Sequence, residues 1–260
     1  MTDRLVLTTG RRWALVVGLP FVLVAIVDGG FQCVSLVGQD SYRIAPIMAP
    51  VANKVSVGVG NGDITVAPGT GKRAVLSGVV NYSLFRPVVK WQHTPTGPFL
   101  VGPNCFWVGN CGAELTLDVP AGEAVRATSG SGNVSARNLT GALDLEDSSG
   151  DILLNYVSGP LVLSASSGDI TGTFISATKV NANDSSGDVD LSFDRAPHNV
   201  QVSDASGDIT VAVPANVSYS VVAKAGSGSS NINVPTNPLS HNVIHLSDDS
   251  GDINVVPSGS

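Results

Sequence analysis

Short runs of alternating apolar and polar residues fill the second half of the chain. The pattern is clearest at Val189–Phe193, Val200–Val202 and Ile209–Val213. Alternation with a period of two predicts β-strands that bury one face and expose the other to water. Few runs have the 3.6-residue period of an amphipathic helix, so the sequence predicts an all-β protein.

A Gly-Asp-Ile-like triplet returns at regular intervals between these strand-like runs. Its copies begin at Gly132, Gly150, Gly168, Gly187, Gly207 and Gly251. A degenerate copy, Ser230-Asn231-Ile232, fills the widest gap, and the spacings are then 18, 18, 19, 20, 23 and 21 residues. A period near twenty is typical of a solenoid. An earlier copy, Gly62-Asp63-Ile64, stands apart from the series.

One period contains two short strands. After Gly150, Ile152–Leu154 and Leu161–Leu163 alternate on either side of a Val157–Pro160 turn. Coils of this kind, stacked about 4.8 Å apart, would build two sheets that face each other across a narrow apolar core. A lone coil buries too little to offset its lost conformational entropy, so only an array is stable. We therefore expect a β-solenoid-like stack of short two-strand coils.

The N-terminal segment predicts a membrane anchor ahead of this stack. Trp13–Val27 carries no charged residue, and three arginines precede it (Arg4, Arg11 and Arg12). Positive residues before an apolar run favour a cytoplasmic N-terminus. We expect a cytoplasmic tail at 1–12, one transmembrane helix or signal anchor at 13–37 and a linker at 38–50. A cleaved signal peptide is the alternative, with Val27-Asp28-Gly29 as its conceivable cleavage site.

Two further regions follow the linker: an N-terminal β part with a disulfide loop at 51–120, and the Ser-Gly-Asp repeat solenoid at 121–260. Cys105 and Cys111 close a tight loop, and an oxidising compartment makes a disulfide the first expectation. Zinc would need a third ligand nearby. Four aromatic residues near this loop form either a recognition patch or a cluster that covers the solenoid end: Trp91, Phe99, Phe106 and Trp107.

The chain is acidic, with a formal net charge of −7, which argues against nucleic acid as a partner. Residues 121–260 contain 15 acidic and 5 basic residues, a balance of −10. Four turns carry aspartates at both ends: Asp147/Asp151, Asp184/Asp188, Asp204/Asp208 and Asp248/Asp252. These side chains either satisfy backbone groups of the turns or bind calcium between coils. The spacing lacks the nonapeptide pattern of calcium β-rolls.

Catalytic motifs are missing from the sequence. Neither a G-x-S-x-G elbow nor a P-loop is present, and the aspartates occupy equivalent turns, whereas an active site should break the repeat. Two of the four histidines, His241 and His245, would share a face on a strand. We therefore assign no catalytic, cofactor-binding or metal-binding residue and expect no cofactor. A polysaccharide-cleaving enzyme that uses paired carboxylates is a remote alternative.

The recurring Ser-Ser-Gly-Asp-Ile turns resemble the bacterial putative-adhesin family, a class of repeat domains. Arg11-Arg12-Trp13 before the apolar run and the Cys105–Pro120 stretch are similar to its actinobacterial membrane-anchored members. The resemblance covers about residues 10–258. It implies a β-solenoid-like fold and a location in the cell envelope, and says little about mechanism.

Together these features predict a single-pass protein of the cell membrane whose C-terminal domain is extracytoplasmic. Its expected role is that of a non-enzymatic, adhesin-like interaction or structural module. The expected partners are the membrane, through the N-terminal helix, and an extracellular protein or glycan, with no nucleic acid. A calcium-stabilised solenoid is the alternative.

Overall fold

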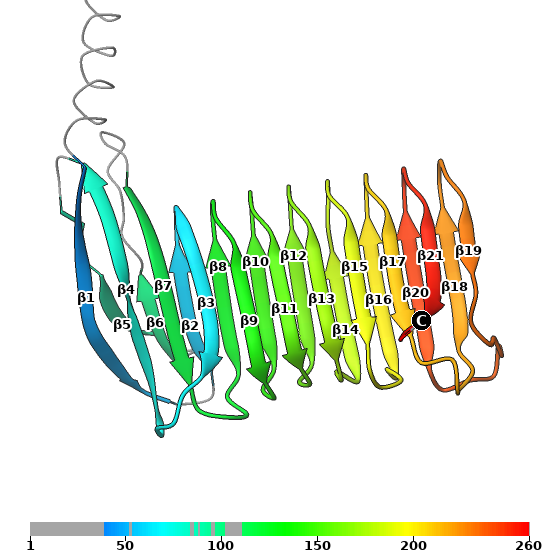
Figure 1. The fold of residues 1–260 in the computed structure, drawn as a ribbon, viewed down its shortest axis with the longest axis horizontal. Helices are drawn as coiled ribbons and strands as arrows, with labels where there is room; N and C mark the ends of the chain where they lie inside the picture. Colours follow the sequence, from blue (N-terminus) through cyan, green and yellow to red (C-terminus); the bar gives the residue numbers. More distant parts are fainter. Residues whose placement is uncertain are drawn as a thin grey trace, which may run out of the picture.

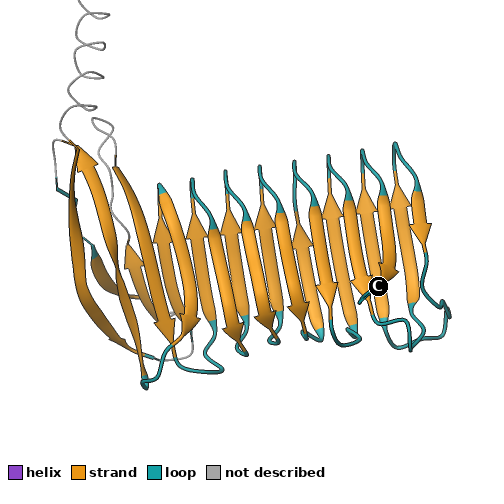
Figure 2. Ribbon diagram, viewed as in Figure 1, coloured by secondary structure: helices purple, strands orange, loops and turns teal. Residues whose placement is uncertain are grey.

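The protein is seen in a computed structural model that describes residues 39–51, 54–83, 86–87, 89–94, 97–101 and 111–259. These residues form 21 strands and no helix. The strands make two facing sheets in one long array, so the all-β prediction is confirmed (Figures 1 and 2).

Sheet A has 11 strands and sheet B has 10. From the N-terminal end of the array, sheet A runs β1 (Gln39–Pro50), β4 (Arg73–Ser83), β7 (Cys111–Val119), β3 (Gly62–Pro68), β9 (Val134–Leu139), β11 (Ile152–Val157), β13 (Ile170–Ile175), β15 (Val189–Phe193), β17 (Ile209–Val213), β21 (Ile253–Pro257) and β19 (Ser230–Ile232). Sheet B runs β5 (Lys90–Thr94), β6 (Gly97–Val101), β2 (Val55–Val59), β8 (Val125–Ser129), β10 (Leu143–Asp147), β12 (Leu161–Ala165), β14 (Lys179–Asn183), β16 (Asn199–Asp204), β20 (Val243–Asp248) and β18 (Ser220–Ala225).

Each coil supplies one strand to each sheet, and successive coils pair in parallel. Leu145 of β10 aligns with Leu163 of β12, and Ile152 of β11 aligns with Ile170 of β13. Both steps are 18 residues, the period of the sequence repeat, so each side chain lies above its equivalent in the next coil. The predicted stack of two-strand coils is confirmed for this part of the chain.

The core lies between the sheets and consists of one apolar column per inward-facing position. Leu143 and Leu145 of β10 face Ile152, Leu154 and Val157 of β11, and all five side chains are buried. Full burial of each contributes about 1.5–3 kcal/mol. Most equivalent positions of neighbouring coils are filled by valine, isoleucine, leucine or alanine, with Gly172 and Phe193 as exceptions, so the core continues along the array.

The order of coils in space differs from their order in sequence at both ends. The Gly62-Asp63-Ile64 copy, apart in sequence, lies next to β9, because the chain between them leaves the stack and returns. The degenerate Ser230-Asn231-Ile232 copy forms β19 at the far edge of sheet A, and β21 pairs between it and β17. The copy that fills the gap before Gly251 in the sequence thus does not lie between the Gly207 and Gly251 coils in space.

The chain that leaves the stack after β3 covers its N-terminal end. Strands β1 and β4 pair antiparallel, and β4 pairs antiparallel with β7, so sheet A ends in a mixed-direction edge. On sheet B, β6 and β5 continue beyond β2. The prediction of a linker at 38–50 is wrong, because Gln39–Pro50 forms the edge strand β1. Strands β5 and β6 lie within the predicted N-terminal β part at 51–120.

Three strands of sheet A have a left-handed residue next to their last residue. Asn138 of β9, Tyr156 of β11 and Phe174 of β13 have φ angles of 55°, 53° and 54°. Each is followed by a buried residue, and the extra residue resets the in-out alternation. The next strand, β15, lacks the bulge, and its register with β13 shifts between Gly172 and Ile175. A row of three exposed side chains therefore stops at Phe174.

Residues 1–38 lie outside the described part of the chain, and with them the predicted tail and transmembrane helix. Among the residues that the structure describes, no helix has the length and hydropathy needed to cross a membrane.

Removing one whole period should cost little. Deletion of Asp151–Gly168 takes out β11 and β12 and joins Gly150 to Asp169, so β9 and β10 meet β13 and β14 in the same register. We expect the array to stay folded with a modestly lower melting temperature, as for a one-dimensional stack. Deletion of Asp151–Gly159, which removes β11 alone, should largely unfold it. Circular dichroism melts distinguish the two, and equal damage would contradict the 18-residue coil.

Candidate functional site

The Ser-Ser-Gly-Asp turns line one edge of the array, the upper edge in Figure 1, and we call this edge the turn ridge. An outer ladder of side chains joins its coils. The side-chain Oδ1 of Asp151 accepts the backbone N–H of Asp169 at 3.0 Å, and Oδ1 of Asp169 accepts the N–H of Asp188 at 2.9 Å. The same bond recurs along the ridge. The side-chain Oδ1 atoms of Asp63, Asn133, Asp188, Asp208 and Asp252 accept the backbone N–H groups of Asn133, Asp151, Asp208, Asp252 and Ser229, respectively.

The glycine of each turn is required by this close stacking. Gly207 has a φ of 153°, and a Cβ there would lie 1.9 Å from the carbonyl oxygen of Gly187. Such a contact is impossible without displacing the backbone of the preceding coil. Glycine therefore lets the turns approach closely enough for the outer ladder to form.

An inner column of carboxyl groups lies beneath the ridge. Its members Asp147, Asp184, Asp204 and Asp248 are 2–6 % exposed. Each Oδ1 accepts backbone N–H groups of its own turn, as Asp184 does from Ser185 at 2.6 Å and Ser186 at 3.3 Å. Each Oδ2 is buried without a hydrogen-bond partner. Such an oxygen bears the desolvation cost of a charge without the compensating bond.

The inner and outer carboxylates are held in different electrostatic environments. Burial raises the pKa of Asp147, Asp184 and Asp204, with smaller contributions from neighbouring aspartates. Asp204 and Asp248 occupy aligned positions on adjacent strands, so their charges repel across one strand spacing. At the outer ladder, the backbone N–H and hydroxyl of Ser229 donate to Asp252 and lower its pKa.

The ridge gathers the four predicted aspartate pairs but does not arrange them as a metal site. Within the described residues, no three histidine, cysteine, aspartate or glutamate side chains are grouped to hold an ion. The outer carboxylates each use one oxygen to accept a backbone N–H, as the turn interpretation requires. His241 precedes β20 and His245 lies within it, so the two do not share a strand face.

The other residues singled out from the sequence lie at the N-terminal end. Trp91 lies in β5 and Phe99 in β6. Phe106, Trp107 and Cys105 fall outside the described residues, so the Cys105–Cys111 disulfide stays a prediction. Cys111 begins β7.

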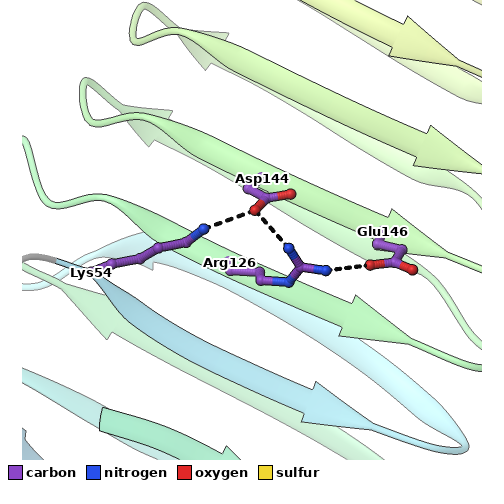
Figure 3. Close-up of polar contacts among 4 residues, drawn as sticks. All are labelled: Lys54, Arg126, Asp144 and Glu146. Atoms are coloured by element: carbon purple, nitrogen blue, oxygen red, sulfur yellow. Dashed lines mark hydrogen bonds and ion pairs between the residues drawn. The ribbon is translucent and has the colours of Figure 1, made fainter. Parts of the chain in front are cut away.

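An ion-pair cluster on the outer face of sheet B was not predicted. Lys54 Nζ and Arg126 Nη1 lie 2.8 and 3.0 Å from the same Asp144 Oδ2, and Arg126 Nη2 lies 2.7 Å from Glu146 Oε2 (Figure 3). Arg126 precedes Asp144 by one period and aligns with it between β8 and β10. That 18-residue offset was the available signal. Partly exposed pairs of this kind contribute at most about 1 kcal/mol each.

Asp188 tests the role of the outer ladder. Its Oδ1 accepts the N–H of Asp208, and its own N–H donates to Asp169. Asp188→Asn keeps the accepting oxygen, as Asn133 does in the wild-type ladder, and should change the melting temperature by less than about 2 °C in calcium-free buffer. Asp188→Ala loses the bond and should lower it by roughly 2–4 °C.

The same two Asp188 variants also test the alternative that the turns bind calcium. A calcium site requires wild-type stability to rise with free calcium as RT ln(1 + [L]/Kd) and to fall again with chelator. If Asp188→Asn loses stability only when calcium is present, the turn interpretation is wrong.

Asp204 tests the inner column. A carboxyl group whose pKa is raised by folding stabilises the fold while protonated, below its unfolded pKa, and that stabilisation is lost as the pH rises through the folded pKa. Wild-type stability should therefore fall from about pH 4 to pH 7. Asp204→Asn removes the middle carboxylate of three and should melt roughly 2–4 °C higher than wild type at pH 7, with the gap closing toward pH 4.

The control for Asp204 is Asp208→Asn, which alters an exposed outer carboxylate that is hydrogen-bonded to the next coil. It should not reproduce the pH-dependent gain. An Asp204→Asn curve parallel to wild type at all pH values would contradict the assignment.

No curated protein sequence matches the chain. Among solved structures, a "putative adhesin" from Bacteroides fragilis is 17% identical with a TM-score of 0.45, over 83% of this chain and 97% of that one. A "putative adhesin" from Parabacteroides distasonis is 17% identical with a TM-score of 0.46, over 84% and 97%. A "putative lipid binding protein" from Parabacteroides distasonis is 12% identical with a TM-score of 0.39, over 84% and 97%.

One family model, described as Toastrack DUF4097, matches residues 51–256. The match takes in the whole turn ridge from Asp63 to Asp252 and most of the chain. The chain therefore belongs to the Toastrack DUF4097 family.

Proposed function

We propose that the chain is a membrane-anchored, extracytoplasmic binding scaffold of adhesin-like type without catalytic activity. The observation that carries this proposal is the uniformity of the array. Parallel coils in one register present two long, flat outer faces, joined by the outer ladder along one edge. A rigid surface of this kind suits recognition of an extended partner, since little conformational entropy is lost on binding.

The distribution of carboxylates supports a role in binding over one in catalysis. In a carboxylate-based active site, two acids occupy different environments that separate their pKa values at one place. Here the inner aspartates, where they occur, and the outer aspartates recur in equivalent positions along the ridge, and one oxygen of each outer carboxylate accepts a backbone N–H from the next coil. This repetition supports binding over catalysis.

Anchoring by the N-terminal segment follows from the apolar run Trp13–Val27 and the arginines before it. On this proposal the segment stays uncleaved and the sheets lie outside the cell membrane. The Cys105–Cys111 disulfide is part of the same proposal, because a disulfide persists in that compartment. The partner is an envelope protein or glycan.

Topology is the first test. Protease added to intact spheroplasts should digest residues 51–260, while a tag at the N-terminus survives inside. Complete protection of the domain, or a mature chain that starts near Gly30, would contradict the anchored arrangement.

The second part of the same experiment tests binding. Spheroplasts that display the full chain should retain labelled envelope fragments several-fold more than spheroplasts without it. Periodate treatment of the fragments identifies a glycan partner, and protease treatment identifies a protein partner. Equal retention with and without the chain, once its display is established by the protease test, would show that the scaffold is not adhesin-like.

A further inference from the structure

A shallow depression of about 340 Å³ lies on the outer face of sheet A, over β3, β9, β11 and β13. We call it the sheet A groove. It is formed by outward side chains in the middle of sheet A, and its lining begins two residues beyond the turn ridge. Its lining includes Thr65, Ser135, Arg137, Leu153, Asn155 and Thr173.

Most polar side chains of the groove are hydroxyls and amides rather than carboxylates. Thr65 Oγ1 and Ser135 Oγ lie 3.1 Å apart, and Asn155 Nδ2 donates to Thr173 Oγ1 at 2.8 Å. These contacts hold the side chains along the rows of the sheet. Hydroxyl groups both donate and accept, so the rows keep capacity for a ligand rich in hydroxyls.

Arg137 is the one cationic residue in the lining of the sheet A groove, and it lies among these hydroxyl and amide groups. Its side chain is exposed, and no ion pair with it occurs in the described residues, in contrast to Arg126 and Lys54. The flanking groups in its row are Ala67 and Asn155, and Asp118 lies beyond Ala67. A free guanidinium provides a bidentate site for a carboxylate.

The acidic ridge does not neutralise this site. The ridge residue of the same coil is Asn133, four residues before Arg137, which carries no charge. Four strand residues span about 13 Å, beyond the Debye length of about 8 Å at physiological ionic strength. The ridge carboxylates of neighbouring coils are at least that far away along their strands. Asp118 is closer, at two strand spacings or about 10 Å, which is still beyond the Debye length. An anionic group can therefore approach Arg137 from the outer face.

Two aromatic rings stand directly beside the groove. Tyr156 follows Asn155, and Phe174 follows Thr173. Their rings stack with centroids 4.4 Å apart and planes at 2°, yet both side chains remain about half exposed. Both residues hold a left-handed backbone, which is unfavourable for a bulky side chain. In the preceding coil the same position is satisfied by Asn138, so an aromatic residue is not needed for the bulge.

We propose that the sheet A groove binds a glycan whose sugars carry carboxylate groups. Arg137 binds the carboxylate, the hydroxyl and amide rows bind sugar hydroxyls, and the rings of Tyr156 and Phe174 cover an apolar sugar face. This inference rests on the proposed binding function and adds the class of ligand.

Calorimetry with a matched pair of oligosaccharides tests the carboxylate. The full chain, kept in mild detergent because of its apolar N-terminal run, is titrated with hexagalacturonate and with its methyl ester, in which the carboxylates are neutral. We expect the acid to bind with a Kd below about 1 mM and the ester at least about tenfold more weakly. Equal affinity for both would overturn the role of the carboxylate.

Two arginine variants place the site. Arg137→Gln should weaken binding of hexagalacturonate about tenfold, the loss expected for one charge-assisted contact. Arg195→Gln is the matched control, since Arg195 is exposed and, like Arg137, makes no ion pair with any of the described residues. It should leave the Kd unchanged. If both variants weaken binding equally, the attraction is nonspecific and the groove is not the site.

The rings are tested without disturbing the bulge. Tyr156→Asn places at β11 the residue that β9 carries at the equivalent position, so the left-handed backbone is retained. Melting curves should show a folded array, and the affinity for hexagalacturonate should fall several-fold. A folded variant with wild-type affinity would remove the rings from the proposal.

Failure of this inference is separable from failure of the proposed function. If hexagalacturonate gives no heat of binding up to about 5 mM, the groove does not take such sugars. Spheroplasts that display Arg137→Gln would then retain envelope fragments as well as wild type does, and the scaffold function would stand with a different site.

Discussion

The array depends on one hydrogen bond that is repeated along its edge, from the backbone N–H of one turn to the side-chain oxygen of the turn before it. In a sheet, strands satisfy each other's backbone groups, but a tight turn between sheets exposes an N–H that no strand reaches. Asp151, Asp169 and Asp188 each supply the missing acceptor to the following coil. The glycine ahead of each aspartate allows the approach, and the 18–20-residue period keeps donor and acceptor aligned.

The inner column of aspartates contains buried carboxyl oxygens, whose desolvation is energetically unfavourable. Asp184 follows β14, and Asp204 and Asp248 end β16 and β20 at aligned positions. Each uses one carboxyl oxygen to accept N–H groups of its own turn, and the second oxygen of each is buried without a partner. Ala165 occupies the corresponding position at the end of β12, and Ser129 at the end of β8, so the column is interrupted. Coils stack with or without an inner aspartate, so the aspartate is not required for stacking. Its contribution is to the geometry of its own turn.

The repeat made the two-strand coil predictable, but it did not allow a prediction of which coils lie next to each other. The period and the alternation of residues such as Val189–Phe193 define a coil with two strands, and that local unit is present. The triplet is the same in every coil, so nothing in it states which coil lies next to which. The places of Gly62-Asp63-Ile64 beside β9 and of Ser230-Asn231-Ile232 at the far edge were therefore not predictable from the repeat. The linker prediction failed because Gln39–Pro50 is an edge strand whose partner β4 lies far away in sequence.

The candidate site was predictable to the same degree. Turn aspartates were expected to satisfy backbone groups, but the sequence could not show that the acceptor acts on the next coil rather than on its own. Arg137 and Tyr156 were overlooked because they are outward residues of ordinary strands, and only the packing of four strands places them together.

The position of β20 and β21 has a consequence for how the molecule is completed. They follow β18 and β19 in the chain, yet they lie between the coil of β16 and β17 and the coil of β18 and β19. Until β20 and β21 are in place, β17 is paired only with β15, and β18 and β19 lack the strands with which they pair. The free end of the sheets is thus closed by insertion rather than by addition. The solenoid grows coil by coil through most of its length, but its last two coils must assemble together.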